Sequence, residues 1–327
     1  MEEIYKPTFV AFHITYVCDN KCPYCYIGEK DRGKHPPLDK LKKIVQKLKE
    51  SDIKKILLVG GDPCKYPHLK ELVSFIKKQN IKLNIISNTL KFDDLDFFIK
   101  NIDEFQATIV GNEKEHDSEV RNKGAYKKLI ENIKKINKKG KSVVIVLSIH
   151  KKNYNSIYSI VKNLYENIKI KELCIQRIIP QGRNKLNLEY SLDKEDVPEV
   201  FEQLDKIKKE FKLKILFEDP FPLCIVPKEY QYLSQKPCVW GFTHFSLSFE
   251  GGVSRCGVDS SYSLGNILKE DIIRIWNKSP TLISFRKRDW LPKECQECKL
   301  LKKCGGGCSL SRITNKDHDC DILCPYY

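Results

Sequence analysis

Three cysteines lie close together on one short segment near the N-terminus. Cys18, Cys22 and Cys25 have the spacing C-x3-C-x2-C, and they follow a strand-like run at residues 8–14. A tetrahedral zinc site takes four protein ligands, whereas three thiolates suit an iron–sulfur cube that binds a further molecule at its fourth iron. An open cluster is therefore the favoured interpretation. A zinc site completed by a distant fourth ligand is the alternative.

Cysteines gather again in the last third of the chain. The sequence has 14 cysteines and no secretory signal. Thiols stay reduced in the cytosol, so metal ligation explains them better than disulfides do. We therefore expect a second metal-bearing region, with zinc as the alternative to iron, formed by Cys238, Cys256, Cys295, Cys298, Cys304, Cys308, Cys320 and Cys324.

The charge of the chain narrows the class of partner. Lys and Arg number 58 against 43 Asp and Glu, a formal net charge of +15. The lysines are spread over nearly every expected helix, whereas nucleic-acid binding usually needs a local patch of Arg and aromatic residues. We therefore consider nucleic acid unlikely as a partner and leave an acidic peptide or protein open. No apolar run is long enough to cross a membrane, which favours a cytoplasmic protein.

Strand and helix periodicities alternate through the first two-thirds of the chain. Alternation of this kind is typical of the α/β class, in which crossover helices cover a parallel sheet. About six β/α units are expected. The predicted strands are 8–14, 56–59, 82–87, 105–110, 142–149 and 170–178, and the predicted helices are 39–50, 67–79, 92–100, 122–139, 154–166 and 194–211. We divide the chain into 1–212 and a cysteine-rich region, 213–327, with a β-hairpin around 245–252 and short helices.

Polar and glycine residues follow the expected strands. Gly60-Gly61-Asp62 ends the second strand, Ser87-Asn88 the third and Thr108 belongs to the fourth. Glycines allow a backbone to approach a ligand closely, and a carboxylate accepts hydrogen bonds from an ammonium group. Arg177 and Arg183, after the sixth strand, suit bidentate binding of a substrate carboxylate; an ordinary polar loop is the alternative.

The N-terminal segment resembles the radical S-adenosylmethionine (SAM) enzymes. Their hallmark is CxxxCxΦC, and Tyr24 fills the aromatic place before the last cysteine. The resemblance implies a partial (β/α)6 TIM-like barrel. It also implies that Cys18, Cys22 and Cys25 hold a [4Fe–4S] cluster whose open iron binds SAM. One electron then splits SAM into methionine and a 5′-deoxyadenosyl radical.

The same resemblance implies a shell of residues around SAM. Gly60, Gly61 and Asp62 replace the family's GGE, with Asp62 one methylene shorter. Ser87 and Asn88 stand where a TNG-like motif is common, and Thr108 and Arg121 fall in a stretch similar to SLDG…HDxxR. Ordinary polar structure is the alternative for these last four residues. We expect His116, in the same stretch, to be a surface or turn residue.

The C-terminal cysteine pattern resembles the SPASM domain, which implies two auxiliary [4Fe–4S] clusters and three clusters in all. The first would use Cys238, Cys256 and Cys308, and the second Cys295, Cys298, Cys304 and a final cysteine, for which Cys324 is preferred to Cys320. The first cluster then lacks a fourth ligand. Cys224 is either that ligand or, beside an open iron, a hydrogen donor to a substrate radical. Cys64 and Cys174 are expected to be structural thiols, although Cys64 follows the GGDP loop and so stands near the expected SAM site.

These resemblances lead to a first hypothesis, a peptide maturase. The radical would abstract hydrogen from a ribosomally made precursor peptide and install a thioether, a carbon–carbon crosslink or an epimerised residue. An external electron donor (flavodoxin or ferredoxin) is expected, and a separate leader-binding protein is possible because no such domain precedes Cys18. The alternatives are a radical SAM oxidative decarboxylase of a haem-type pathway, a sulfatase-type protein maturase, or a non-enzyme such as an electron carrier or a zinc-bearing nucleic-acid binder.

Overall fold

The computed structural model describes residues 4–28, 33–184, 188–233, 237–257, 263–311 and 320–326. Ten strands form one sheet in the order β10-β9-β8-β1-β2-β3-β4-β5-β6-β7. The strands are β1 Phe9–Thr15, β2 Lys55–Gly60, β3 Lys82–Ser87, β4 Glu104–Ile109, β5 Val143–Ile149, β6 Glu172–Arg177, β7 Lys214–Phe217, β8 His244–Ser248, β9 Gly252–Ser254 and β10 Ser263–Asn266.

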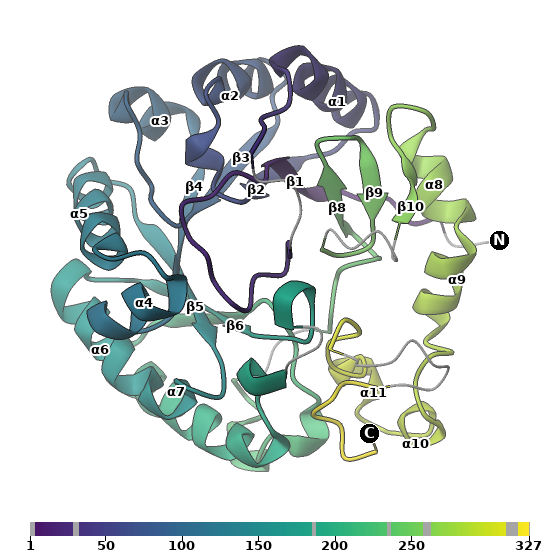
Figure 1. The fold of residues 1–327 in the computed structure, drawn as a ribbon. Coiled ribbons are helices and arrows are strands. Elements are labelled where there is room, and N and C mark those ends of the chain that lie inside the picture. The colour runs from purple at the N-terminus through teal and green to yellow at the C-terminus, as the bar shows by residue number, and fades with distance from the viewer. Residues whose placement is uncertain are drawn as a thin grey trace.

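Strands β1 to β7 are parallel, and each of them pairs with the next. The sheet curves, and the helices of the first two-thirds surround it as an outer ring (Figure 1). Parallel strands place all their carboxyl ends at one edge, which is where loops build a site. The predicted α/β class with a partial barrel is confirmed.

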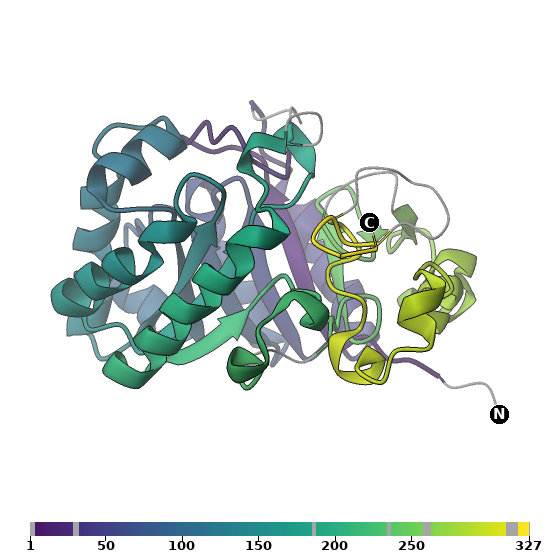
Figure 2. The ribbon, with the colours of Figure 1, turned by 90° about the horizontal axis from the view of Figure 1, so that it is seen from below.

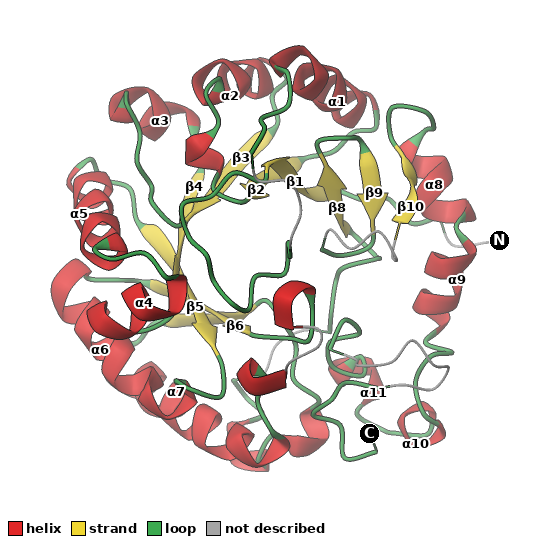
Figure 3. Cartoon of the chain, in the orientation of Figure 1, coloured by secondary structure: helices red, strands yellow, loops and turns green. Residues whose placement is uncertain are grey.

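The helices that cover the outer face of the sheet are amphipathic. In α1, for example, Leu41, Ile44, Val45 and Leu48 are buried, which is the i, i+3, i+4, i+7 pattern of a helix packed on one side. The helices are α1 Leu38–Glu50, α2 Leu69–Lys78, α3 Leu95–Asn101, α4 Glu113–Val120, α5 Ala125–Lys138, α6 Ile157–Ile168, α7 Val197–Phe211, α8 Ile272–Lys278, α9 Pro280–Lys287, α10 Lys293–Gln296 and α11 Leu301–Cys304 (Figure 3).

The predicted hairpin exists and extends the barrel sheet. Strands β8 and β9 are antiparallel, and β8 pairs with β1 in parallel register. Figure 2 shows the C-terminal segment and helices α8 and α9 beside the barrel rather than across its mouth. In the part of the chain that the structure describes, no helix is long and apolar enough to cross a membrane.

Two elements of the first two-thirds differ from the prediction. A seventh parallel strand, β7, follows α7 and pairs with β6, although only six strands are expected from the sequence. Helix α4 occupies 113–120, where the sequence predicts no helix. The division at 212/213 remains a proposal; β7 lies just beyond it and belongs to the same sheet as β6.

Candidate active site and cluster sites

The segment with the three N-terminal cysteines leaves β1 and is held from several sides. The Lys21 amide donates to the Val120 carbonyl at the end of α4, and Asn122 Nδ2 donates to Asn20 Oδ1 at 2.9 Å. Lys65 Nζ contacts Asp19 Oδ2 at 2.9 Å. The loop is therefore fixed by contacts from the ends of β2 and α4, and its three thiols have defined positions.

Those thiols influence one another. Burial raises the pKa of Cys22 to about 12, and the nearby Cys25 and Cys18 add to the shift. Burial also raises the pKa of Cys18, against a hydrogen bond that Asn88 Nδ2 donates to its Sγ at 3.2 Å. Three crowded, half-buried thiols with a donor aimed at one sulfur form a suitable donor set for an iron–sulfur cluster.

The glycines of the GGDP loop are required by this chain's own backbone. A Cβ on Gly60 would stand 2.1 Å from the Thr15 carbonyl oxygen, and one on Gly61 would stand 2.4 Å from that of Val17. The amides of Gly61 and Asp62 donate to those same two carbonyls at 2.8 Å each. The end of β2 therefore lies against the segment that enters the cysteine loop. The glycines are needed because two segments of this chain approach each other closely there. The sequence alone suggested that the glycines allow close approach to a ligand.

Asp62 is fully buried at the end of this loop. Its carboxylate accepts hydrogen bonds from Ser87 Oγ at 2.7 Å, Thr89 Oγ1 at 2.7 Å and the Cys64 amide at 3.0 Å. Burial raises its pKa, and these donors oppose the rise. Asp62 and Ser87, both predicted to contact SAM, are thus bound to each other. Cys64 is half-buried in the turn that follows, whereas Cys174 is buried inside the barrel.

Tyr24 and Asn88 lie at the cysteine loop, as predicted. The Tyr24 ring packs against the rings of Tyr190 at 5.3 Å and His150 at 5.6 Å. Its hydroxyl makes a hydrogen bond with Cys22, and Asn88 donates to Cys18. These two side chains therefore contact the residues predicted to hold the first cluster.

The remaining residues of the predicted SAM shell have different surroundings. Thr108 is half-buried on the interior face of β4, opposite Val146, whereas Arg121 is exposed at the left-handed C-cap of α4. His116 is 1% exposed, and its Nδ1 accepts from the Val110 amide. The expectation of a surface or turn histidine was therefore wrong, because α4 turns His116 into the protein, where burial lowers its pKa to about 4.

The two arginines after β6 contact other parts of the chain. Arg177 is 2% exposed and forms an ion pair with Asp321, with further contacts to Ser311 Oγ and the Pro220 carbonyl. Arg183 donates from Nη1 to the Cys22 carbonyl at 2.9 Å and from its amide to the Cys25 carbonyl at 3.1 Å. The interpretation that a substrate carboxylate is bound here was wrong for Arg177, which is buried in an ion pair, and stays a prediction for Arg183. The loop joins the cysteine segment to the C-terminal segment.

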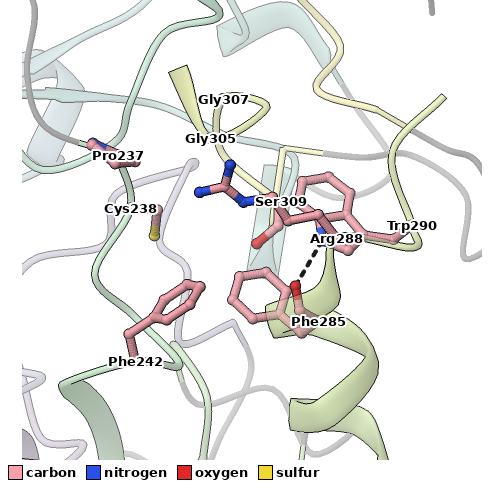
Figure 4. A pocket seen from close by; sticks show the side chains of 9 residues that line it. All are labelled: Pro237, Cys238, Phe242, Phe285, Arg288, Trp290, Gly305, Gly307 and Ser309. Carbon is pink, nitrogen blue, oxygen red and sulfur yellow. Dashed lines mark hydrogen bonds between the residues drawn. The ribbon is translucent and has the colours of Figure 1, made fainter. Parts of the chain in front are cut away.

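The C-terminal cysteines form two groups, of which the first contains Cys238, Cys256 and Cys308. Burial raises the pKa of Cys256 well above its ordinary value, Arg255 opposes the rise, and the nearby Cys238 and Cys308 add to it. Cys238 lines a small pocket beside the Gly305–Gly307 turn (Figure 4). Residues lining this pocket are Pro237, Cys238, Phe242, Phe285, Arg288, Trp290, Gly305, Gly307 and Ser309.

The second group contains the other C-terminal thiols, including Cys224. Burial raises the pKa of Cys224 to about 11, and Cys324, Cys304 and Cys298 add to it; Cys295 likewise interacts with Cys324 and Cys304. Cys224 was expected beside the first auxiliary cluster, and the structure instead brings it, exposed, to the second group.

Both candidates for the last cysteine belong to this second group. Cys320 and Cys324 are hydrogen-bonded to each other; the bond lowers the pKa of Cys324 to about 7 and raises that of Cys320. Cys324 also has a hydrogen bond with Cys295. Its preference as a ligand over Cys320 stays a prediction.

The barrel interior holds polar residues that the sequence did not single out. Tyr26, next to Cys25, makes a 3.0 Å hydrogen bond with His13 Nε2 on β1. Its side chain is 40% exposed. Desolvation, followed by the nearby Cys25 and Cys256, raises its pKa, so Tyr26 lies near thiols of both the N-terminal and the first C-terminal group. The only feature of the sequence that could have pointed to Tyr26 is its position directly after the CxxxCxxC segment.

Three thiol groups fit three iron–sulfur clusters. In the described residues, no three His, Cys, Asp or Glu side chains are grouped tightly enough to hold one metal ion. A four-iron cube takes its thiolates at separate irons and so needs a wider arrangement. Donors to sulfur are present, from Asn88 to Cys18 and from the Leu223 amide to Cys304 Sγ at 3.3 Å.

Comparison with known families agrees with this geometry. Residues 12–164 match the family model of the radical SAM superfamily, and residues 238–299 match that of SPASM, an iron–sulfur cluster-binding domain. The chain carries a radical SAM domain followed by a SPASM domain. These domains bind [4Fe–4S] clusters and SAM. The three N-terminal thiols lie in the first matched region and Cys238, Cys256, Cys295 and Cys298 in the second, whereas Cys304, Cys308, Cys320 and Cys324 follow it.

The chain is similar along most of its length to a peptide cyclase and to a synthase of an iron porphyrin. It is 22% identical over 98% of its length to the PqqA peptide cyclase of Gluconobacter oxydans, of which the match covers 92%. It is 24% identical over 92% of its length to the Fe-coproporphyrin III synthase of Methanosarcina barkeri, of which the match covers 83%.

The fold is also shared with a solved structure. SuiB of Streptococcus suis, solved with its precursor peptide SuiA, superposes with a TM-score of 0.78 and 19% identity, over 98% of this chain and 76% of that one. The likeness establishes the fold, and the family match places the SPASM domain in the C-terminal third. Peptide-modifying enzymes are thus among the relatives of this chain.

Proposed function

We propose that this chain is a cytoplasmic radical SAM oxidoreductase that matures a ribosomally made peptide. It would remove hydrogen from the precursor and leave a thioether, a carbon–carbon crosslink or an epimerised residue. The whole-length likeness to a peptide cyclase supports this function. The observation that carries it is an open cleft of about 520 Å³ beside the cysteine loop.

The cleft is open to solvent and is lined by aromatic, proline and charged residues. It lies between Tyr16, the His35–Lys40 region and the hairpin turn at Phe249–Glu250. Cys25 and Phe249 both pack against the cluster formed by Tyr16 and Ile27, so a chain in the cleft would pass near one of the N-terminal thiols. Lys34 and Lys40 supply positive charge on one side, which suits an acidic peptide.

The chain's own residues would perform binding and positioning. Cys18, Cys22 and Cys25 would hold the SAM-binding cluster, and Tyr24, Gly60, Gly61, Asn88 and Thr108 would shape the SAM site. When bound, the cluster and SAM supply the electron transfer and the radical that starts the reaction. Asn88 would hold the Cys18 sulfur by its hydrogen bond, and Arg183 would fix the loop through the Cys22 carbonyl.

An external electron donor is part of this proposal. The formal net charge of +15 favours association with an acidic flavodoxin or ferredoxin through complementary surfaces. If the cleft alone binds the precursor too weakly, a separate leader-binding protein would deliver it.

The experiment is anaerobic incubation of the reconstituted protein with SAM, dithionite and the peptide encoded next to its gene. We expect 5′-deoxyadenosine above the peptide-free control and a peptide with altered mass, or, for epimerisation, altered chirality after hydrolysis. The contradicting result is 5′-deoxyadenosine no higher with the peptide than without it, although all three clusters are intact. The same result must be obtained when the leader-binding protein is present. Cys22→Ala is the matched inactive control.

A porphyrin decarboxylase is the second candidate, because the Fe-coproporphyrin III synthase match covers most of both chains. The two arginines that suggested carboxylate binding are occupied within the chain, so this candidate rests on the likeness alone. Incubation with carboxylated iron porphyrins separates the two functions: loss of carbon dioxide from the porphyrin, with no change in the peptide, would favour the second.

A further inference from the structure

The loop that follows β6 lies against the N-terminal cysteine loop. We call residues 178–183 the β6 loop. Arg183 donates from Nη1 to the Cys22 carbonyl at 2.9 Å and from its amide to the Cys25 carbonyl at 3.1 Å. A Cβ on Gly182 would stand 2.2 Å from the Cys25 carbonyl oxygen, so the backbones of the two loops are in direct contact. The β6 loop therefore holds the Cys22–Cys25 turn.

The same loop is anchored to the C-terminal segment. Gln181 is 7% exposed, and its Nε2 donates to the Leu310 carbonyl at 3.0 Å, across 129 positions of sequence. Arg177, at the end of β6, donates from Nη1 to Ser311 Oγ at 3.1 Å. Because Gln181 and Arg183 are neighbours in the same loop, a shift of the C-terminal segment at Leu310 is passed to the cysteine loop over a very short stretch of backbone.

The anchor point is a fixed part of the cysteine-rich region. Leu310 and Ser311 are 6% and 0% exposed. The Ser311 amide donates to the Cys308 carbonyl at 2.9 Å, and the Ile322 amide donates to the Ser311 carbonyl at 2.7 Å. Leu310 thus belongs to a buried, hydrogen-bonded segment that also carries a predicted cluster ligand, Cys308.

The first half of the cysteine loop has supports of a different origin. Asn122 Nδ2 donates to Asn20 Oδ1 at 2.9 Å, and the Lys21 amide donates to the Val120 carbonyl at 2.9 Å. Both contacts come from the end of α4, so they fix the start of the loop independently of the C-terminal segment. The Cys22–Cys25 turn is the half that the β6 loop contacts, and its position therefore depends on both regions of the chain.

We propose that the β6 loop makes SAM binding at the N-terminal cysteine loop depend on the C-terminal segment. Gln181 is the positioning residue, and it acts through Arg183 on the Cys22–Cys25 turn. Coupling between two sites typically changes an affinity about 5- to 150-fold, and a single hydrogen bond belongs at the lower end of that range. SAM binding needs no substrate, so the coupling does not depend on whether the substrate is a peptide or a porphyrin.

The test measures SAM binding to the full chain with its clusters in the oxidised state, in which no electron is available to split SAM. Kd is measured anaerobically by equilibrium dialysis with ¹⁴C-labelled SAM and no substrate. In Gln181→Met, which keeps a side chain of similar length and removes its donor, we expect Kd to rise about fivefold. Gln203→Met is the matched control: Gln203 Nε2 also donates to a backbone carbonyl, that of Tyr154, at 2.8 Å, and this variant should have the parent Kd.

Two further measurements separate positioning from a general loss of structure. The KM for SAM in 5′-deoxyadenosine formation should rise with Kd in Gln181→Met, whereas kcat at saturating SAM should not change. Arg183→Met should also raise Kd. The double variant should bind SAM no more weakly than Arg183→Met alone, because residues that act through one another are not additive.

Each of the other outcomes counts against the coupling. A parent Kd in Gln181→Met, an equal rise in Gln203→Met, or a double variant in which the two effects multiply would overturn the proposal. Partial loss of iron does not disturb the comparison, because Kd is a property of the chains that bind SAM. If Gln181→Met holds no iron, Gln181→Asn takes its place, since its side chain is one methylene shorter than the span to Leu310. Loss of all iron in both variants would show a role in folding alone and would also overturn the proposal.

Discussion

Arg177 at the end of β6 and Asp321 near the C-terminus form a buried ion pair that joins the barrel to the cysteine-rich segment. The two side chains are 2% and 0% exposed, and they are 144 positions apart in the sequence. The Asp321 carboxylate also accepts from the amides of Cys308 and Leu323. One buried carboxylate therefore fixes both a barrel strand and the backbone of a predicted cluster ligand.

Breaking one side of this pair should be costly. Removing one partner of a buried ion pair leaves an unpaired charge, which costs about 3–5 kcal/mol. We expect Arg177→Met to lower the free energy of unfolding by that amount, measured by anaerobic denaturation. Iron analysis should also show partial loss of the auxiliary clusters, because Asp321 would no longer be held.

The double variant Arg177→Met with Asp321→Leu tests the cause. It removes both charges, so it should lose less stability than the sum of the single variants. Lys47→Ala, which breaks the exposed Lys47–Glu50 pair, should change stability by less than about 1 kcal/mol. A similar small effect for Arg177→Met would show that the buried pair does not contribute as described.

The sequence predicted the parts of the site that depend on local spacing. The C-x3-C-x2-C segment, the GGDP loop and the alternation of each strand are patterns only a few residues long. Their positions can therefore be read directly from the sequence. The role expected for Arg177 and the place expected for Cys224 were wrong because their partners, Asp321 and Cys324, are distant in the sequence. Only the folded chain brings such residues together.

The two missed elements lacked the usual signals. Helix α4 has the sequence EKEHDSEV, in which only His116 and Val120 are buried, so it has almost no apolar periodicity. Strand β7 is four residues long, and its side chains are half-buried or exposed. Sheet pairing with β6 stabilises β7, and capping interactions around Asn112 and Glu115 stabilise α4.

Removal of one N-terminal thiolate should abolish SAM cleavage while leaving the auxiliary clusters. For Cys22→Ala we expect iron to fall from about twelve to about eight per chain, with 5′-deoxyadenosine at background. Cys174→Ala, which removes a buried barrel thiol that packs with Val144 and Val146, is the control and should retain about twelve irons. SAM cleavage by Cys22→Ala would exclude the N-terminal loop as the SAM-binding cluster site.

The hydrogen bond from Asn88 to Cys18 should tune the SAM-binding cluster. Donors to a cluster sulfur stabilise the reduced state, so losing one makes reduction harder. In Asn88→Ala we expect a more negative reduction potential, measured by EPR-monitored titration of the signal that changes when SAM is added. Asn167→Ala, on the exposed face of α6, should have the parent potential. An unchanged potential in Asn88→Ala would mean that this hydrogen bond is absent from the loaded protein.

Acid should destabilise the fold through two buried histidines. His116 and His150 are each 1% exposed, and burial lowers the pKa of both to about 4. In the unfolded chain these side chains titrate near ~6.5. The unfolded state therefore binds more protons than the native state between about pH 6.5 and 4. The stability that the neutral rings provide is complete above that window and is lost as the pH falls through it.

Each histidine should contribute at most about 2 kcal/mol to the loss of stability between pH 7 and pH 5. Anaerobic urea denaturation at the two pH values measures this difference in the free energy of unfolding. His116→Phe keeps an aromatic ring against Tyr126, at 5.7 Å from the His116 ring in the parent, and removes one titrating group, so about half of the dependence from this pair should disappear. His68→Gln, at an exposed position on the surface, should leave the dependence unchanged. An equal pH dependence in His116→Phe and the parent would show that the buried ring does not control acid stability.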